Sequence, residues 1–463
     1  SEIKINAQYY RALCALELSN NDAEDLFLRF VRQFPENAKT KLAYFQVGKS
    51  YFNQGKYKEA LEWFTKVSSI DISGKDGAEY QFKTAYSYFE TGDYANAKPL
   101  FNMVKEKKSP YSEQATYYYA YIAYLDKDYK TALANFELLK NSKNYENSYP
   151  YYISAIYFLD KRYDDVLAYT IPILESTKQQ YETEMLRIVG ATYFAKEDYQ
   201  NAIKYYERFM AQDKGATQNN QDSYQIGYTY YKMGDYVKSI EQLGKLTTDP
   251  NAYSQYGLYT LGDSYIRTTN KQGARNAFKE SSKLDYDKEI KESALFNFAK
   301  LSYELQFHNI ALDAAQTYLK TYPRSARINE AKTLLANILL NTKNYRDAID
   351  LLESIDNKDD EAKAAYQKVT YYRALEFYNE RAFENAIGLF LRSNYYTIDP
   401  EIHALATYWC AEAMYEVRKY AESVEYFTNF LKMPVARKTD LYNYANYALG
   451  YAALEGEIYP TSA

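Results

Sequence analysis

One recurring segment constrains the fold of this chain more than any other feature. Its clearest copy, residues 41–72, carries two apolar stripes at helical spacing on either side of a turn at Gly55, which predicts two short amphipathic helices. Gly48 in the first helix and Ala60 in the second are small, so the helices can approach closely. A single pair of such helices cannot bury its own apolar stripe, and it therefore requires stacked copies.

The rest of the sequence supplies these copies. Aligned on Tyr57, the residue that opens the second helix, they recur every 34 to 39 residues. The counterparts of Tyr57 are Asn20, Tyr94, Tyr129, Tyr163, Tyr199, Tyr236, Lys271, His308, Tyr345, Phe383, Tyr420 and Tyr459. A small residue stands nine positions before each of them, except in the first copy, which has Arg11. The alignment predicts twelve helix-turn-helix repeats and the first half of a thirteenth.

The repeated residues resemble a known family. Gly48, Tyr51, Ala60 and Phe64, with an aromatic residue at Tyr44, are similar to the tetratricopeptide repeat pattern. This resemblance covers essentially the whole chain. It implies an all-α fold, a right-handed α-α superhelix (solenoid) of about twelve helix-turn-helix repeats plus half a repeat. It also implies that the first helices line a concave groove.

The domain organisation follows from the repeats. We expect residues 1–463 to form a single continuous solenoid. Pro172 falls late in a second helix whose packing positions depart from the pattern, so we predict a bend near residues 160–180, dividing 1–180 from 181–463. Tyr459 opens a second helix that the sequence does not complete, and we therefore expect a piece of a longer protein.

Charge and composition exclude several classes of function. The net charge of -5 lacks the excess of positive charge that is typical of a protein that binds nucleic acid. No segment approaches the roughly 20 consecutive apolar residues of a membrane span. Cys14 and Cys410 lie many stacked helices apart, so we expect no disulfide between them.

The sequence contains few residues of the types that usually carry catalysis or bind metals, with two histidines and two cysteines. His308 occupies a turn position that tyrosine fills elsewhere, and we expect it to have a packing role. His403 follows Pro400, and we expect it in a solvated connector. No sequence motif of a metalloprotease, a nucleotide-binding loop or a nucleophile elbow is present. We therefore expect no catalytic residue, no cofactor and no metal site.

The remaining candidate surface is a row of aromatic rings on the first helices. Phe45 and Phe52 lie seven positions apart, so they share one helix face, which we expect to be the concave one. The predicted partner-binding groove consists of Phe45, Phe52, Phe82, Tyr86, Phe89, Tyr117, Tyr121, Tyr124, Tyr151, Phe158, Tyr224, Tyr228 and Tyr231. The alternative is that these rings pack between neighbouring repeats, which is the more frequent role of any single ring at such a place.

The resemblance implies a non-catalytic scaffold for protein–protein interaction that binds an extended peptide or a partner helix in the groove. The length and the Tyr-, Asn- and Lys-rich composition resemble long bacterial envelope proteins of this family, which implies a larger cell-envelope assembly. That implies a periplasmic or outer-membrane-associated location, with the cytoplasm as the alternative. A glycan-binding protein that uses the groove aromatics, or the scaffold part of a longer enzyme, are alternative functions. The sequence leaves the oligomeric state open.

Overall fold

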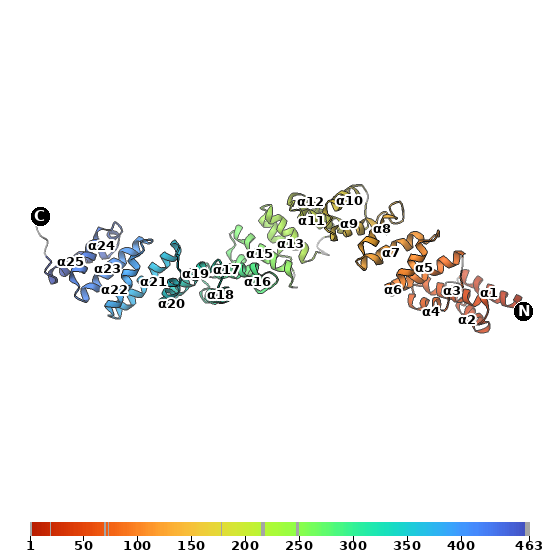
Figure 1. The fold of residues 1–463 in the computed structure, drawn as a ribbon, viewed down its shortest axis with the longest axis horizontal. Helices are drawn as coiled ribbons and strands as arrows, with labels where there is room; N and C mark the ends of the chain where they lie inside the picture. Colours follow the sequence, from red (N-terminus) through yellow and green to blue (C-terminus); the bar gives the residue numbers. More distant parts are fainter. Residues whose placement is uncertain are drawn as a thin grey trace. The chain divides into compact units, whose positions relative to one another are not determined.

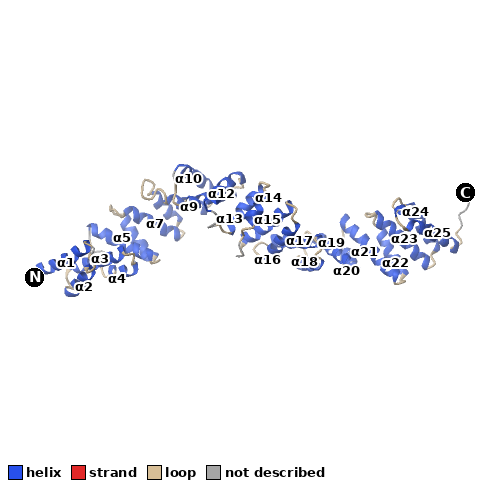
Figure 2. Ribbon diagram, turned by 180° about the vertical axis from the view of Figure 1, so that it is seen from behind, coloured by secondary structure: helices blue, strands red, loops and turns tan. Residues whose placement is uncertain are grey.

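The computed structural model describes residues 2–18, 20–68, 71–72, 74–176, 178–213, 218–246 and 250–458. These residues fold into α-helices joined by turns, with one short 3₁₀ helix and no strand within those ranges (Figure 1, Figure 2). The chain divides into two compact units, Ser1–Thr217 and Gln218–Ala463. The all-helical fold predicted from the repeats is confirmed, whereas the handedness of the superhelix, the concave groove and the bend stay predictions.

In the part that the structure describes, the first unit contains six pairs of helices. Its first helices are α1 (Glu2–Glu17), α3 (Ala38–Asn53), α5 (Gly74–Glu90), α7 (Ser112–Leu125), α9 (Tyr149–Leu159) and α11 (Glu182–Ala195). Its second helices are α2 (Ala23–Gln33), α4 (Tyr57–Phe64), α6 (Tyr94–Lys105), α8 (Tyr129–Glu137), α10 (Tyr163–Ser176) and α12 (Tyr199–Asp213). Pro172 lies inside α10, as the alignment predicts.

The second unit contains six further pairs and an unpaired last helix within the described residues. Its first helices are α13 (Asn220–Lys232), α15 (Ala252–Arg267), α17 (Lys288–Glu304), α19 (Ile328–Asn341), α21 (Asp360–Asn379), α23 (Pro400–Glu416) and α25 (Leu441–Glu455). Its second helices are α14 (Tyr236–Leu243), α16 (Lys271–Lys283), α18 (His308–Thr321), α20 (Tyr345–Glu353), α22 (Phe383–Asn394) and α24 (Tyr420–Lys432). The 3₁₀ helix Ala436–Lys438 precedes α25.

The alignment on Tyr57 predicts where the second helices begin. Every described counterpart of Tyr57 after the first repeat is the first residue of its helix, including Lys271, His308 and Phe383. The first repeat differs, because α2 begins at Ala23, three residues after Asn20. Tyr459 lies outside the described residues.

The turns explain this regularity. From α3 onward, the residue two positions before each described second helix has a positive φ, at Gly55, Gly92, Lys127, Lys161, Glu197, Gly234, Thr269, Gln306, Lys343, Arg381 and Arg418, and Glu457 after α25 has one too. The next N–H group donates to the carbonyl five residues back, for example Lys56 N to Tyr51 O at 3.0 Å. This is the hydrogen bond of a Schellman C-cap, which ends one helix and turns the chain into the next. Asp or Asn often follows and caps the second helix, as Asp128 does for α8.

We expect Lys127→Gly to stabilise the protein. Lys127 is exposed and has a φ of 61°, a left-handed conformation that is unfavourable for any residue with a Cβ atom. Glycine relieves this strain, and the net gain in the free energy of unfolding is about 0.5–1 kcal/mol after its greater unfolded-state entropy is counted. Denaturant titration measures the change. The control Lys130→Gly, inside helix α8, is expected to destabilise by about 1 kcal/mol, and a loss of stability in both variants would contradict the prediction.

Small residues and aromatic rings fit together within several pairs of helices. A Cβ atom at Gly48 would lie 2.5 Å from Cε1 of Phe64, and one at Gly262 would lie 2.7 Å from Cε1 of Phe278. The rings therefore occupy the space that the missing side chains leave. This contact is the one that the repeat pattern predicts between the first and second helices.

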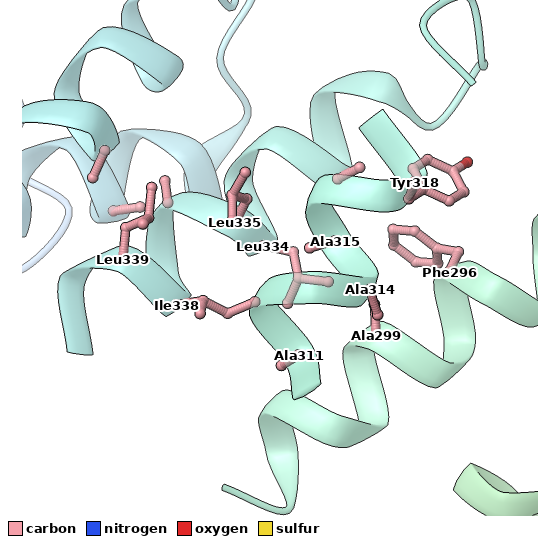
Figure 3. Close-up of a cluster of buried hydrophobic side chains, with 14 of the residues drawn as sticks. Phe296, Ala299, Ala311, Ala314, Ala315, Tyr318, Leu334, Leu335, Ile338 and Leu339 are labelled. Atoms are coloured by element: carbon pink, nitrogen blue, oxygen red, sulfur yellow. The ribbon is translucent and has the colours of Figure 1, made fainter. Parts of the chain in front are cut away.

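The core is shared between consecutive repeats. In the second unit, Phe296 and Ala299 of α17 face Ala311, Ala314, Ala315 and Tyr318 of α18, and the same cluster continues to Leu334, Leu335, Ile338 and Leu339 of α19 (Figure 3). Because each layer is only two helices thick, its interior is completed by the next repeat. Stability is therefore a property of neighbouring repeats, and a local change is expected to act on the repeats beside it.

Two buried glutamines tie a first helix to the connector that follows its repeat. The Gln255 side chain is fully buried. Its Nε2 donates to Leu284 O at 3.1 Å and Asp287 O at 2.9 Å, and its Oε1 accepts from Tyr286 N at 3.0 Å and Asp287 N at 2.7 Å. Gln367 makes the same kind of contact with both backbone groups of Asp399. Each amide thus holds the start of the next first helix in place.

Candidate functional site

The predicted aromatic residues of the first unit form a ladder of ring contacts that crosses α3, α5, α7 and α9. Phe52 meets Tyr86 at 5.7 Å, measured between ring centroids, and Phe89 meets Tyr121 at 5.8 Å. Tyr117 and Tyr124 both contact Tyr152, at 6.2 and 5.5 Å. Tyr151 contacts Tyr181 at 5.0 Å and Phe158 contacts Tyr163 at 6.0 Å. Except for the contact of Phe158 with Tyr163, which lies within one repeat, these rings pack against one another from repeat to repeat.

Two members of the predicted groove are buried. Phe45 is 1% exposed and lies between Phe64 and Tyr80, while Phe82 is 7% exposed and stacks on Tyr111. Both rings belong to the hydrophobic core of their unit. The other predicted residues of the ladder are half-buried, and their role in binding stays a prediction.

The three predicted residues of the second unit line a pocket instead. Tyr224, Tyr228 and Tyr231 of α13 face Tyr256, Tyr259, Thr260 and Asp263 of α15, with Ile290 of α17 at one side. The pocket has a volume of about 380 Å³. It lies across three consecutive first helices, and five of its eight lining residues are tyrosines. We call it the tyrosine pocket.

Two carboxylates fix tyrosine side chains of this pocket. Tyr231 Oη donates to Asp263 Oδ2 at 2.6 Å, and Tyr256 Oη donates to Asp287 Oδ2 at 3.0 Å. Burial, together with the hydrogen bond to Asp263, raises the pKa of Tyr231 to about 12. The backbone N–H of Ile290 lowers the pKa of Asp287, which caps α17. Near neutral pH Tyr231 is therefore neutral and the Asp287 carboxylate is charged.

The sequence pattern misses several members of both surfaces. In the ladder it omits Tyr118 and Tyr152, which precede the small residues Ala120 and Ser154 by two positions. In the pocket it omits the four polar or aromatic residues Tyr256, Tyr259, Thr260 and Asp263 of α15. Paired tyrosines, such as Tyr117 with Tyr118, are a signal that could have identified the ladder residues. No signal in the sequence places Asp263 beside Tyr231, because that contact depends on how two repeats stack.

The described residues give little support for a metal site, for chemistry at histidine or cysteine, or for a membrane-spanning helix. Within the ranges that the structure describes, no group of His, Cys, Asp and Glu side chains is arranged to hold a metal ion. His403 lies inside α23 and is half-buried, so the predicted place in a solvated connector is wrong: the helix already begins at Pro400, a residue favoured at the first helical position. Cys14 is exposed and Cys410 is buried, and both are free thiols. None of the described helices combines the length and the apolar character that a membrane crossing requires.

Three protein-family profiles match parts of the chain. A profile described as tetratricopeptide repeat matches residues 42–72, and a second profile of that description matches residues 79–107. A profile described as anaphase-promoting complex, cyclosome, subunit 3 matches residues 195–281, which include most of the tyrosine pocket. No curated protein matches the chain.

Among solved structures, the chain is similar to three tetratricopeptide proteins at low identity. The P58(IPK) TPR domain is 16% identical, with 71% of this chain and 97% of that chain covered and a TM-score of 0.24. A tetratricopeptide repeat protein from Parabacteroides merdae ATCC 43184 is 15% identical, with coverages of 64% and 98% and a TM-score of 0.26. The TPR2AB domain of yeast Sti1, in complex with pHSP90, is 13% identical, with coverages of 58% and 98% and a TM-score of 0.30. Scores this low carry no argument about what this chain binds.

Proposed function

We propose that this chain, in which two tetratricopeptide repeat profiles match residues 42–72 and 79–107, is a protein-interaction scaffold that binds a segment of a partner protein at the tyrosine pocket. The observation that carries the proposal is the pocket itself. Concave sites lined by aromatic rings and a few placed polar groups are typical of binding sites. Tyrosine is also enriched among the residues that dominate binding energy at protein interfaces.

The geometry favours an anchored side chain over a buried helix. The pocket of about 380 Å³ lies across three first helices, so a segment that crosses these helices can insert one side chain between the rings. The tyrosines are already ordered by ring contacts, such as Tyr224 with Tyr256 at 5.9 Å, and by their carboxylate partners. A pre-ordered pocket loses little side-chain entropy on binding.

A peptide selected from a display library against the whole chain tests this proposal. Its affinity is then measured by fluorescence anisotropy for the wild type and for Tyr228→Ala. We expect the substitution to weaken binding at least about tenfold, as the loss of an aromatic anchor does. Tyr395→Ala is the matched control, because Tyr395 is 79% exposed and lies outside the pocket. Equal affinities of the wild type and Tyr228→Ala would contradict the proposal.

We also propose, on resemblance alone, that the partner belongs to a larger assembly of a bacterial cell envelope. The location of the full-length protein would then be the periplasm or the outer membrane, with the cytoplasm as the alternative. Fractionation of cells that express the full-length protein distinguishes these locations. Recovery only with cytoplasmic markers would contradict the envelope proposal and would leave the pocket proposal standing.

A further inference from the structure

We propose that the group that enters the tyrosine pocket is a cation, the side chain of a lysine or arginine in the partner segment. This inference rests on the proposed function, since it names the ligand chemistry of the same pocket. Three features of the pocket carry it: the faces of its rings, the charge of its lining, and the way its carboxylates are held.

The rings provide electron-rich faces. An ammonium or guanidinium group within about 6 Å of a tyrosine centroid is attracted by the negative ring face. Five tyrosines line the pocket. Two of them, Tyr231 and Tyr256, donate their hydroxyl hydrogens to carboxylates. Donation to an anion polarises a phenol and makes its ring more negative, so these two rings attract a cation more strongly.

The lining carries one formal charge, and it is negative. Asp263 is the only charged residue among those that line the pocket. A ligand carboxylate would therefore meet Asp263 and no lining Lys, Arg or His. A neutral apolar side chain would leave the carboxylate without a new partner, whereas a cation gains a charge-assisted hydrogen bond. The charge of the pocket thus discriminates among the three ligand classes.

The present cationic partner of Asp263 can be replaced. Arg267 Nε lies 3.4 Å from Asp263 Oδ2, and the two side chains are 54% and 32% exposed. An exposed ion pair one helical turn apart contributes little to stability. Arg267 is therefore free to turn into solvent when a ligand cation arrives, and Tyr231 keeps the carboxylate in position meanwhile.

A second cation already lies against the wall of the pocket. Lys232 Nζ is 5.9 Å from the centroid of the Tyr228 ring, at the outer limit of a cation–ring attraction. Lys232 does not line the pocket itself. Asp287, which holds Tyr256, supplies a second negative charge beside the pocket. Neither Arg267 nor Lys232 lines the pocket, and the carboxylates of Asp263 and Asp287 bind its tyrosines, an arrangement that favours a basic side chain inside.

The test compares short peptides that differ only at one central residue, which is lysine, arginine, norleucine or glutamate. Ligand-observed saturation-transfer NMR titrations with the whole chain measure their affinities. We expect the lysine and arginine peptides to bind roughly tenfold more tightly than the norleucine peptide, and the glutamate peptide to bind most weakly. In Asp263→Asn, which keeps an oxygen acceptor for Tyr231, most of this preference is expected to disappear.

The controls separate this inference from the proposed function. Asp126→Asn removes an exposed carboxylate that is paired with Lys98 in the first unit, and it is expected to leave the preference unchanged. If all four peptides bind equally and Tyr228→Ala weakens them all, the cation inference is overturned and the binding pocket stands. If Tyr228→Ala changes the binding of no peptide, both the inference and the proposed function fail.

Discussion

Gln255→Leu is expected to lower the local free energy of unfolding around α15–α17 by about 2–4 kcal/mol, the largest effect of any single polar substitution that we predict. The glutamine amide is fully buried and makes four hydrogen bonds to the backbone between Leu284 and Asp287. Leucine has nearly the same volume but satisfies none of these groups. The connector that begins α17 would then lose the contacts that hold it on α15.

The measurement has to be local, because long repeat arrays do not unfold as one cooperative unit. Hydrogen–deuterium exchange followed by mass spectrometry reports the opening of the segment 281–291 directly. Gln272→Leu is the matched control, since Gln272 is exposed and its amide reaches only Asn276. Unchanged exchange of the connector in Gln255→Leu would refute the role assigned to this side chain.

Ala60→Leu is expected to destabilise α3 and α4 by about 1–3 kcal/mol through overpacking. Ala60 has no exposed surface, and its carbonyl and the Phe64 ring already face Gly48 without room for a side chain. The larger residue must therefore push the two helices apart or displace Phe64 from its place against Tyr80. Either change opens the core that the second and third repeats share.

The denaturation midpoint of the first unit measures this effect. The control is Ala95→Leu, the same substitution at an exposed position of α6, where we expect a change within about 0.5 kcal/mol. An Ala60→Leu midpoint equal to that of the wild type would mean that helix spacing is not set by this small residue. Such a result would also weaken the repeat alignment on which the fold prediction depends.

The repeat pattern predicts local structure well because the information is local. The turn residues, their left-handed conformation and the start of each second helix all lie within a few positions of Tyr57 and its counterparts. The first repeat is an exception: α2 begins at Ala23, three residues after the position of Asn20. His403 is another: the position after Pro400 predicts a connector, whereas α23 begins at that proline, because proline is compatible with the first turn of a helix.

The candidate site was predictable only in part. The seven-residue spacing of rings on the first helices selects Tyr224 and Tyr231, which line one pocket together with Tyr228 between them, and their role in binding stays a prediction. The same spacing in the first unit selects Phe45 and Phe82, which are buried. Spacing along one helix places side chains on a common face, but it does not tell whether the next repeat covers that face.

The sequence by itself determines the helix pairs, the turns between them and the contact of small residues with aromatic rings, because these depend on spacing within a single repeat. Only the tertiary structure decides which tyrosines are buried and which line a pocket. It also decides that Asp263 of α15 meets Tyr231 of α13, and that Gln255 meets the connector before α17. These contacts join residues about thirty positions apart, and they form only when one repeat is stacked on the next.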